Sequence, residues 1–126
     1  MDIGATVLER AKIEPASGMQ AKSFLPVIER GEPVRDAVFI QYDHQASNPG
    51  TNEPARVHSL IDGRYRISVF HGTGWGELYD LASDPGEFDN LWDDPAHAST
   101  RARMAERLLL AEIEHVDRVP LPTRRA

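Results

Sequence analysis

Hydrophobic and polar positions alternate through the middle of the chain and predict an antiparallel sheet. Residues 37–42 are apolar on both faces, which favours a strand in the interior of its sheet. The alternating runs 56–61 and 64–70 are separated by Asp62-Gly63. This dipeptide predicts a hairpin with a type I′ turn, in which both central residues have positive φ. Residues 77–81 complete a meander of about four strands.

Apolar residues at helical spacing occur both before and after the predicted strands in the sequence. Apolar side chains within residues 3–12 recur on one helical face, with Asp2 as a candidate cap, and residues 23–28 predict a short helix or turn closed by Gly31. Asp94-Pro95 is a typical start for the last helix, since Asp caps well and Pro suits the first position. The stripe of this helix that is expected to lie across the sheet comprises Ala98, Ala102, Ala105, Leu109, Ile113 and Val116.

These elements predict one α+β domain over residues 1–126, an antiparallel sheet of about four strands with the C-terminal helix packed across one face. Residues 1–34 are expected to form a helical lead-in and residues 35–92 the sheet. Residues 93–126 are expected to form the last helix and an extended tail. The polar stretch from Asp43 to Ala55 is expected to be a long loop, and ordered loops of that length often carry function.

Composition excludes several classes of function. The net charge is −6, and Arg101, Arg103 and Arg107 are expected on a solvated helix face, so neither a nucleic acid nor an anionic membrane is an expected partner. The chain has no cysteine, which removes disulfides, thiolate metal sites and thiol nucleophiles. It has no apolar run of about 18 residues and no signal-peptide pattern. We therefore expect a cytoplasmic protein.

Several segments occur together in a recognisable order. Residues 2–13 and 19–26 are followed by residues 35–39. The more specific segments are Asp62-Gly63-Arg64-Tyr65-Arg66, Trp75-Gly76-Glu77-Leu78-Tyr79-Asp80-Leu81, Asp84-Pro85-Gly86-Glu87 and Asn90-Leu91. With these segments the chain resembles the C-terminal portion of the sulfatase family (arylsulfatase-like), within the alkaline-phosphatase superfamily. The resemblance implies the fold of the sulfatase C-terminal subdomain.

The residues that carry this resemblance are expected to stabilise the fold. Leu78, Tyr79 and Leu81 suit the packing of a strand, Asp84-Pro85 suits a turn, and Asn90 can bond backbone groups beside it. A marker of the family is therefore not expected to mark an active site.

The resemblance also implies catalytic parts that this chain lacks. A sulfatase uses a formylglycine, made from Cys or Ser in a Cys/Ser-x-Pro/Ala-x-Arg motif, and a divalent, calcium-type metal held by Asp and Asn. Residues 99–103 contain the serine and arginine of that motif but not its Pro or Ala. Asp93-Asp94 is expected to be a helix start, and the five histidines have no metal-binding spacing. We expect no catalytic residue, metal ligand or cofactor in this chain, and activity is expected only of a parent sulfuric ester hydrolase.

The resemblance implies that loops of this subdomain can close one wall of a substrate pocket. Asp43, His44 and Gln45 follow the first strand, and Arg56 and His58 lie on the returning strand. A carboxylate, an imidazole and an amide close together can bind a polar or sugar-like leaving group. The alternative is a polar loop whose groups are satisfied by turn hydrogen bonds.

The sequence is compatible with three functions. The first hypothesis is that the chain is a subdomain that stabilises a sulfatase and forms one wall of its substrate pocket, with the missing sulfatase catalytic domain as its partner. Alternatively, it is an independent binding or assembly module that self-associates through an exposed sheet face, since large apolar patches drive association. A third hypothesis is a small enzyme that uses Asp43, His44 and His58 as acid and base.

Overall fold

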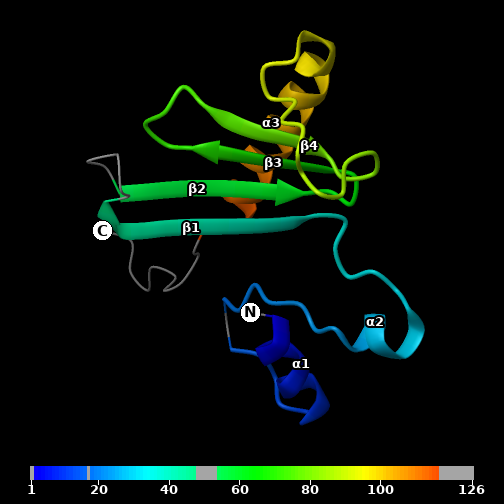
Figure 1. Cartoon of the computed structure of the whole chain (residues 1–126). Helices are drawn as coiled ribbons and strands as arrows, with labels where there is room; N and C mark the ends of the chain where they lie inside the picture. Colours follow the sequence, from blue (N-terminus) through cyan, green and yellow to red (C-terminus); the bar gives the residue numbers. More distant parts are fainter. Residues whose placement is uncertain (1, 17, 48–53, 117–126) are drawn as a thin grey trace. The chain divides into compact units, whose positions relative to one another are not determined.

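The computed structural model describes residues 2–16, 18–47 and 54–116 (Figure 1). The described residues form two compact units: those within 36–114 make up one, and those before and after this range make up the other. The boundary after Arg35 falls one residue from the expected end of the lead-in. The expected extended tail lies outside the described residues.

The smaller unit contains two short helices, α1 (Asp2–Arg10) and α2 (Leu25–Arg30). The expected features of the second helix are confirmed, because Pro26 lies in the first turn and Gly31 ends the helix with a φ of 67°. The carboxylate of Asp2 accepts hydrogen bonds from the Arg35 guanidinium, at 2.7 and 3.0 Å, and from the Lys22 backbone N–H. Arg35 thereby holds the pKa of the Asp2 carboxyl below its usual range.

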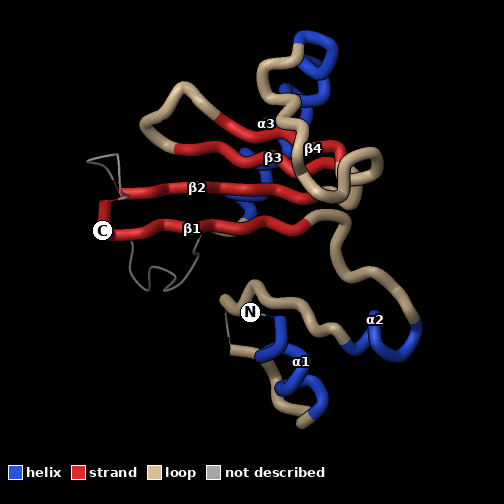
Figure 2. The backbone as a smooth tube through the Cα atoms, in the orientation of Figure 1, coloured by secondary structure: helices blue, strands red, loops and turns tan. Residues whose placement is uncertain are grey.

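The larger unit is an antiparallel sheet covered by a helix, which confirms the predicted α+β fold. Its strands are β1 (Val38–Ser47), β2 (Pro54–Ile61), β3 (Tyr65–Phe70) and β4 (Gly76–Asp80), hydrogen-bonded in the order β1-β2-β3-β4. A 3-10 turn, η1 (Pro95–His97), leads into helix α3 (Ala98–Glu114), which crosses one face of the sheet (Figures 1 and 2). The Asp94 carboxylate accepts a hydrogen bond from the Ala96 N–H at 2.9 Å, which confirms the predicted cap.

Two expectations about the first strand were wrong. β1 is an edge strand of the four-stranded sheet, and it continues to Ser47, so the first five residues of the expected loop are strand. Val38, Ile40 and Tyr42 point away from α3 and are 50%, 46% and 53% exposed. The apolar side chains on both faces of β1 therefore did not indicate that the strand lies in the interior of the sheet.

The core lies between the sheet and α3. Phe39, Leu60, Ile67 and Leu78 are aligned across the four strands by their register. The last three are buried, and Phe39 packs against them. From α3 the buried residues are Met104 and Leu108, with Ala111 packed beside them.

The predicted helix stripe was therefore wrong. Leu109 and Ile113 are 55% and 57% exposed, whereas Met104 and Leu108 are buried. At 3.6 residues per turn, a one-residue shift turns the helix by about 100° and exchanges its faces. The contacts at residues 104, 108 and 111 have the spacing of one helical face.

Arginines fix the rotation of α3. The Asp62 carboxylate is 7% exposed and forms ion pairs with Arg107 at 2.6 Å and Arg103 at 3.3 Å. Arg107 also pairs with Asp36 at 2.9 Å. Arg103 is exposed, as expected for a solvated face, whereas Arg107 is only 30% exposed, and both arginines join the helix to the hairpin turn. Arg101 reaches the backbone carbonyl of Trp92 and lies over its ring.

The predicted hairpin after β2 is confirmed, but its turn is not type I′. Gly63 has a φ of 86°, whereas Asp62 has a negative φ. The Asp62 carboxylate instead accepts hydrogen bonds from the N–H groups of Arg64 and Tyr65, at 3.2 and 2.8 Å. Burial raises the pKa of this carboxyl, but these hydrogen bonds and the nearby arginines outweigh it, so the pKa lies below its usual range.

The residues that carry the sulfatase resemblance have structural roles, as predicted. Asn90 accepts hydrogen bonds from the N–H groups of Leu78 and Trp92 and donates one to the Gly76 carbonyl, each at 3.0 Å. A Cβ on Gly76 would lie 2.5 Å from ring atoms of Trp92. Glycine is therefore required where the indole ring covers the start of β4.

Candidate functional site

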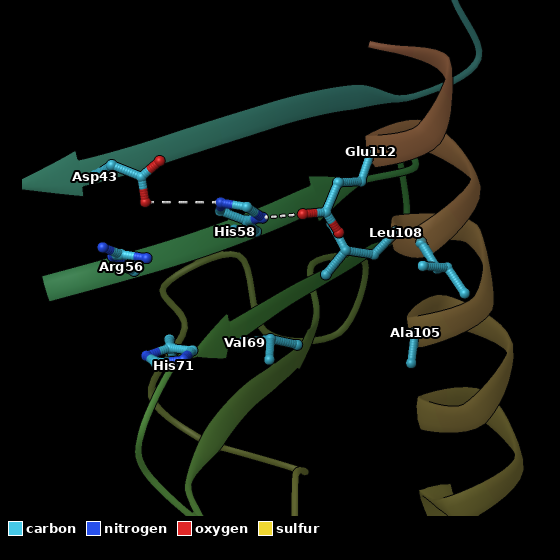
Figure 3. Close-up of a pocket in the computed structure, with 9 residues that line it drawn as sticks. Asp43, Arg56, His58, Val69, His71, Ala105, Leu108 and Glu112 are labelled. Carbon is cyan, nitrogen blue, oxygen red and sulfur yellow. Dashed lines mark ion pairs between the residues drawn. The ribbon is translucent and has the colours of Figure 1, made fainter. Parts of the chain in front are cut away.

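A pocket of about 430 Å³ lies within the larger unit, between one end of the sheet and α3 (Figure 3). Strands β1 and β2 and His71, which follows β3, supply most of its polar residues, and α3 supplies most of its apolar residues together with Glu112. The residues that line it are Asp43, Arg56, His58, Val69, His71, Ala105, Leu108, Leu109 and Glu112.

Strand register explains why polar residues distant in sequence meet here. Asp43 on β1 is the partner of Arg56 on β2, and the Arg56 carbonyl accepts a hydrogen bond from the His71 N–H at 2.9 Å. These three residues therefore form a row across the sheet. His58 lies two residues after Arg56 on β2, so alternation places its side chain on the same face.

His58 lies between two carboxylates (Figure 3). Its Nδ1 is 2.9 Å from Oε1 of Glu112 on α3, and its Nε2 is 3.8 Å from Oδ1 of Asp43. The other oxygen of Asp43 accepts a hydrogen bond from the Gln41 amide at 2.6 Å. Phe39 packs edge-on against the imidazole, with ring centroids 5.8 Å apart. These contacts hold the imidazole and both carboxylates at the pocket.

The rest of the lining is aliphatic. Val69 on β3 and Ala105, Leu108 and Leu109 on α3 form this side of the pocket. Leu108 is buried in the core, whereas Leu109 is 55% exposed. The pocket therefore presents polar groups on one side and a hydrocarbon surface on the other.

The structure brings together three of the five residues that the sequence indicated. Asp43, Arg56 and His58 line the pocket. His44 does not, because strand alternation places it on the opposite side of β1 from Asp43, where its ring stacks on Tyr42 with centroids 5.8 Å apart. The side chain of Gln45 lies outside the described residues.

Sequence reasoning missed two polar residues of the pocket. Glu112 belongs to α3. The predicted apolar positions placed the wrong face of this helix against the sheet, so they did not indicate that the Glu112 side chain points into the pocket. His71 follows the last residue of β3. Extending the hairpin register by one pair would have placed it opposite Arg56.

The described residues that line this pocket can hold a polar ligand, and they include no Ser, Thr, Cys or Lys. Within the described ranges, no group of three or more His, Asp or Glu side chains is arranged to hold a metal ion. In the same part of the chain, no helix is both long and apolar enough to cross a membrane. Carboxylates accept hydrogen bonds from hydroxyl groups, and arginine donates to anions.

Comparisons with known proteins agree on one family. Residues 1–114 match the family described as N-sulphoglucosamine sulphohydrolase, C-terminal. The chain is 24% identical to the N-acetylglucosamine-6-O-sulfatase of Bacteroides thetaiotaomicron over 95% of its own length and 22% of that protein's. It is 30% identical to the uncharacterized sulfatase YidJ of Escherichia coli K12, covering 98% of this chain and 23% of that protein.

A similar fold occurs in solved structures. The phosphonate monoester hydrolase of Agrobacterium radiobacter matches with a TM-score of 0.79 and 29% identity, over 94% of this chain and 25% of that one. The chain thus spans about a quarter of the length of the relatives that it matches.

Proposed function

The chain belongs to the N-sulphoglucosamine sulphohydrolase C-terminal family and is the C-terminal domain of a sulfatase-type protein, and from this premise we propose its role. We propose that it stabilises a sulfatase-like hydrolase and supplies one wall of the substrate pocket. Without a catalytic domain it does not turn over esters. The observation that supports this proposal is the meeting of Asp43, Arg56 and His58 with Glu112 beside an aliphatic surface.

The pocket has the composition of a site for a hydroxylated leaving group. Ligand sites combine a mostly apolar lining with a few convergent polar groups that fix the orientation of the ligand. Here the carboxylates of Asp43 and Glu112 can accept hydrogen bonds from hydroxyls, and His58 lies between them. The aliphatic side can contact the C–H face of a ring. A relative that matches over most of this chain is named as a sulfatase of N-acetylglucosamine, which supports a sulfated sugar as the ester.

The chemical step would belong to the catalytic domain. In the parent family, a formylglycine would supply the nucleophile and a calcium-type metal would activate it. The residues of this pocket would bind and orient the leaving group. The same scaffold could also serve the hydrolysis of phosphate or phosphonate esters. The pocket binds the leaving group, so its role does not depend on which group is transferred.

The second role of the chain would be contact with that catalytic domain. Val38, Ile40 and Tyr42 are each about half exposed on the side of β1 away from α3. Apolar side chains adjacent on one sheet face are typical of a surface that another domain covers.

An activity assay on the isolated 126-residue chain tests the proposal. With an aryl sulfate as substrate, hydrolysis should not exceed the background rate, with or without Ca²⁺. Turnover that follows the folded protein through purification, survives chelation and is lost in His58→Gln would overturn the proposal. That result would favour the small independent enzyme.

Self-association is the second candidate function, and the edge position of β1 favours it. This strand carries no charged side chain between Val38 and Tyr42 that would oppose pairing with another edge. If the chain is an assembly module, sedimentation should show a dimer or larger species that Ile40→Lys dissociates. A monomer at high protein concentration would rule against this candidate.

A further inference from the structure

Helix α3 has a second apolar face, which the sheet does not cover. Its exposed apolar row, called the outer stripe below, consists of Ala98, Ala102, Ala105, Leu109 and Ile113. Leu109 and Ile113 are 55% and 57% exposed, although both are large. At about 100° per residue, this row lies roughly a third of a turn from Met104 and Leu108, which pack in the core. The helix is therefore apolar on two sides, one against the sheet and one facing solvent.

The spacing of the outer stripe is that of a contact between helices. Its five residues follow one another at intervals of four, three, four and four positions. Alternation of three and four is the pattern by which one helix packs its side chains between those of another. A helix that only covers a sheet needs one apolar face, and α3 already has one. The outer stripe is therefore suited to a second helix.

The sizes of the side chains along the outer stripe indicate what this second helix is. The stripe is all alanine up to residue 105 and then carries Leu109 and Ile113. Two parallel copies would set large side chains against each other at one end and leave a gap between alanines at the other. In an antiparallel pair, Ala102 of one copy lies opposite Leu109 of the other. Ala98 likewise lies opposite Ile113, so the stripe is complementary in shape to an inverted copy of itself.

Charges beside the outer stripe favour the same orientation. Arg101 and Glu112 flank the stripe on one side, toward opposite ends of α3, and their side chains are 38% and 45% exposed. An antiparallel pair brings Arg101 of each copy toward Glu112 of the other, whereas a parallel pair would bring like charges together. Exposed ion pairs add little affinity, but like charges oppose the wrong orientation. Shape and charge therefore agree.

We propose that the outer stripe of α3 binds a second copy of this chain, as an antiparallel helix pair around a two-fold axis. The contact is small, because the 17 residues of α3 span only about 25 Å. The dimer is therefore weak and reversible, with a dissociation constant of roughly 10–100 µM. This surface is distinct from the edge of β1, and the inference goes beyond the proposed function because the catalytic domain has no part in it.

Sedimentation equilibrium of the full chain, over roughly 1–500 µM, tests the dimer. The average mass should rise with concentration from 14.1 kDa toward twice that value. Leu109→Lys should raise the dissociation constant at least about tenfold, because the two-fold axis places two ammonium groups in the apolar contact. Ile113→Lys should act alike at a stripe residue that does not line the pocket. Glu106→Gln should lower the constant, since it removes like charges that the axis brings together.

Leu110→Lys is the matched control. It makes the same substitution at the next residue, which is 59% exposed but lies about 100° further around the helix, outside the outer stripe. It should change the dissociation constant less than about threefold. An unchanged helical signal in circular dichroism would show that each variant is folded.

Disulfide crosslinking tests the orientation. The chain has no cysteine, so introduced thiols report on the pairing alone. In an equal mixture of the variants Ala98→Cys and Ile113→Cys, oxidation should join one variant to the other, because a disulfide needs Cα atoms within about 7 Å. Mass spectrometry distinguishes this product from disulfides that join a variant to itself.

Three results would overturn the inference. The first is a monomer over the whole concentration range. The second is a dimer that Leu109→Lys and Leu110→Lys weaken equally, or that Ile40→Lys dissociates and Leu109→Lys does not. The third is crosslinking only between identical variants, which would indicate a parallel pair. Turnover by the isolated chain would instead contradict the proposed function and leave this inference standing.

Discussion

Replacement of Asn90 by Ala would test whether the residues that mark this family hold the fold together. Asn90 lies in the connection between β4 and η1, and its side chain makes three hydrogen bonds of 3.0 Å with backbone groups. Two of these groups belong to Gly76 and Leu78, which are buried. Alanine would leave the Leu78 N–H and the Gly76 carbonyl without these partners.

The cost can be worked from these contacts. A net hydrogen bond contributes about 0.5–1.5 kcal/mol, and a buried group left unsatisfied costs about 1–3 kcal/mol. Three bonds with two buried partners give a loss of about 2–4 kcal/mol in the free energy of unfolding. For a protein of this size, with a total stability of about 5–15 kcal/mol, that is a large fraction.

Urea unfolding followed by circular dichroism measures the effect. With an m-value of about 1.5 kcal/mol/M, a loss of 3 kcal/mol lowers the midpoint by about 2 M. Asn90→Asp keeps an oxygen acceptor but loses the donor to Gly76, so it should fall between wild type and Asn90→Ala. Asp89→Ala, at the exposed neighbouring residue, should change stability by less than about 0.5 kcal/mol. A loss below 0.5 kcal/mol for Asn90→Ala would refute the reasoning.

Three further substitutions follow from the packing and the charges. Gly76→Ala should lower the free energy of unfolding by about 1–3 kcal/mol in a denaturant titration, because its Cβ would lie 2.5 Å from an indole ring. Gly74→Ala has nothing within 4 Å of the new Cβ and should be nearly neutral. Equal effects of the two substitutions would contradict the packing. Met104→Ala should cost about 2–5 kcal/mol and Leu109→Ala less than about 1 kcal/mol, and the reverse order would restore the helix face inferred from sequence. Asp62→Asn should be less stable than wild type at pH 7. The Asp62 carboxyl has a lowered pKa in the folded chain, so it contributes stability above the pKa of the unfolded chain, and protonation removes this contribution. The difference in stability should therefore shrink as the pH falls below about 4, and a difference that is constant down to about pH 2 would contradict this.

Local signals in the sequence were sufficient for the order of the elements. The hairpin signal at Asp62-Gly63, the cap at Asp94 and the stop at Gly31 depend on residues a few positions apart, and each produced its element. The face of α3 depends instead on contacts distant in sequence. Arg107 pairs with the hairpin turn, and this tertiary contact helps to select a face that the alanine-rich stripe did not show.

The site was predictable only where it depended on strand register. Asp43, Arg56 and His58 follow from pairing two neighbouring strands, so the sequence placed them together. Glu112 required the rotation of α3, which the sequence did not determine. The edge position of β1 could not be inferred either, because apolar side chains report what packs against the faces of a strand and not whether another strand pairs along its edge.

The most direct test of the account replaces the matching C-terminal segment of the Bacteroides thetaiotaomicron N-acetylglucosamine-6-O-sulfatase with this chain. Steady-state hydrolysis of N-acetylglucosamine 6-sulfate would be measured for the chimera and for its His58→Gln variant, with Arg10→Gln as the control. We expect turnover in the chimera and a KM about tenfold higher in His58→Gln, with kcat changed far less. A KM that His58→Gln leaves unchanged in an active, folded chimera would contradict the assignment of this pocket as a substrate wall.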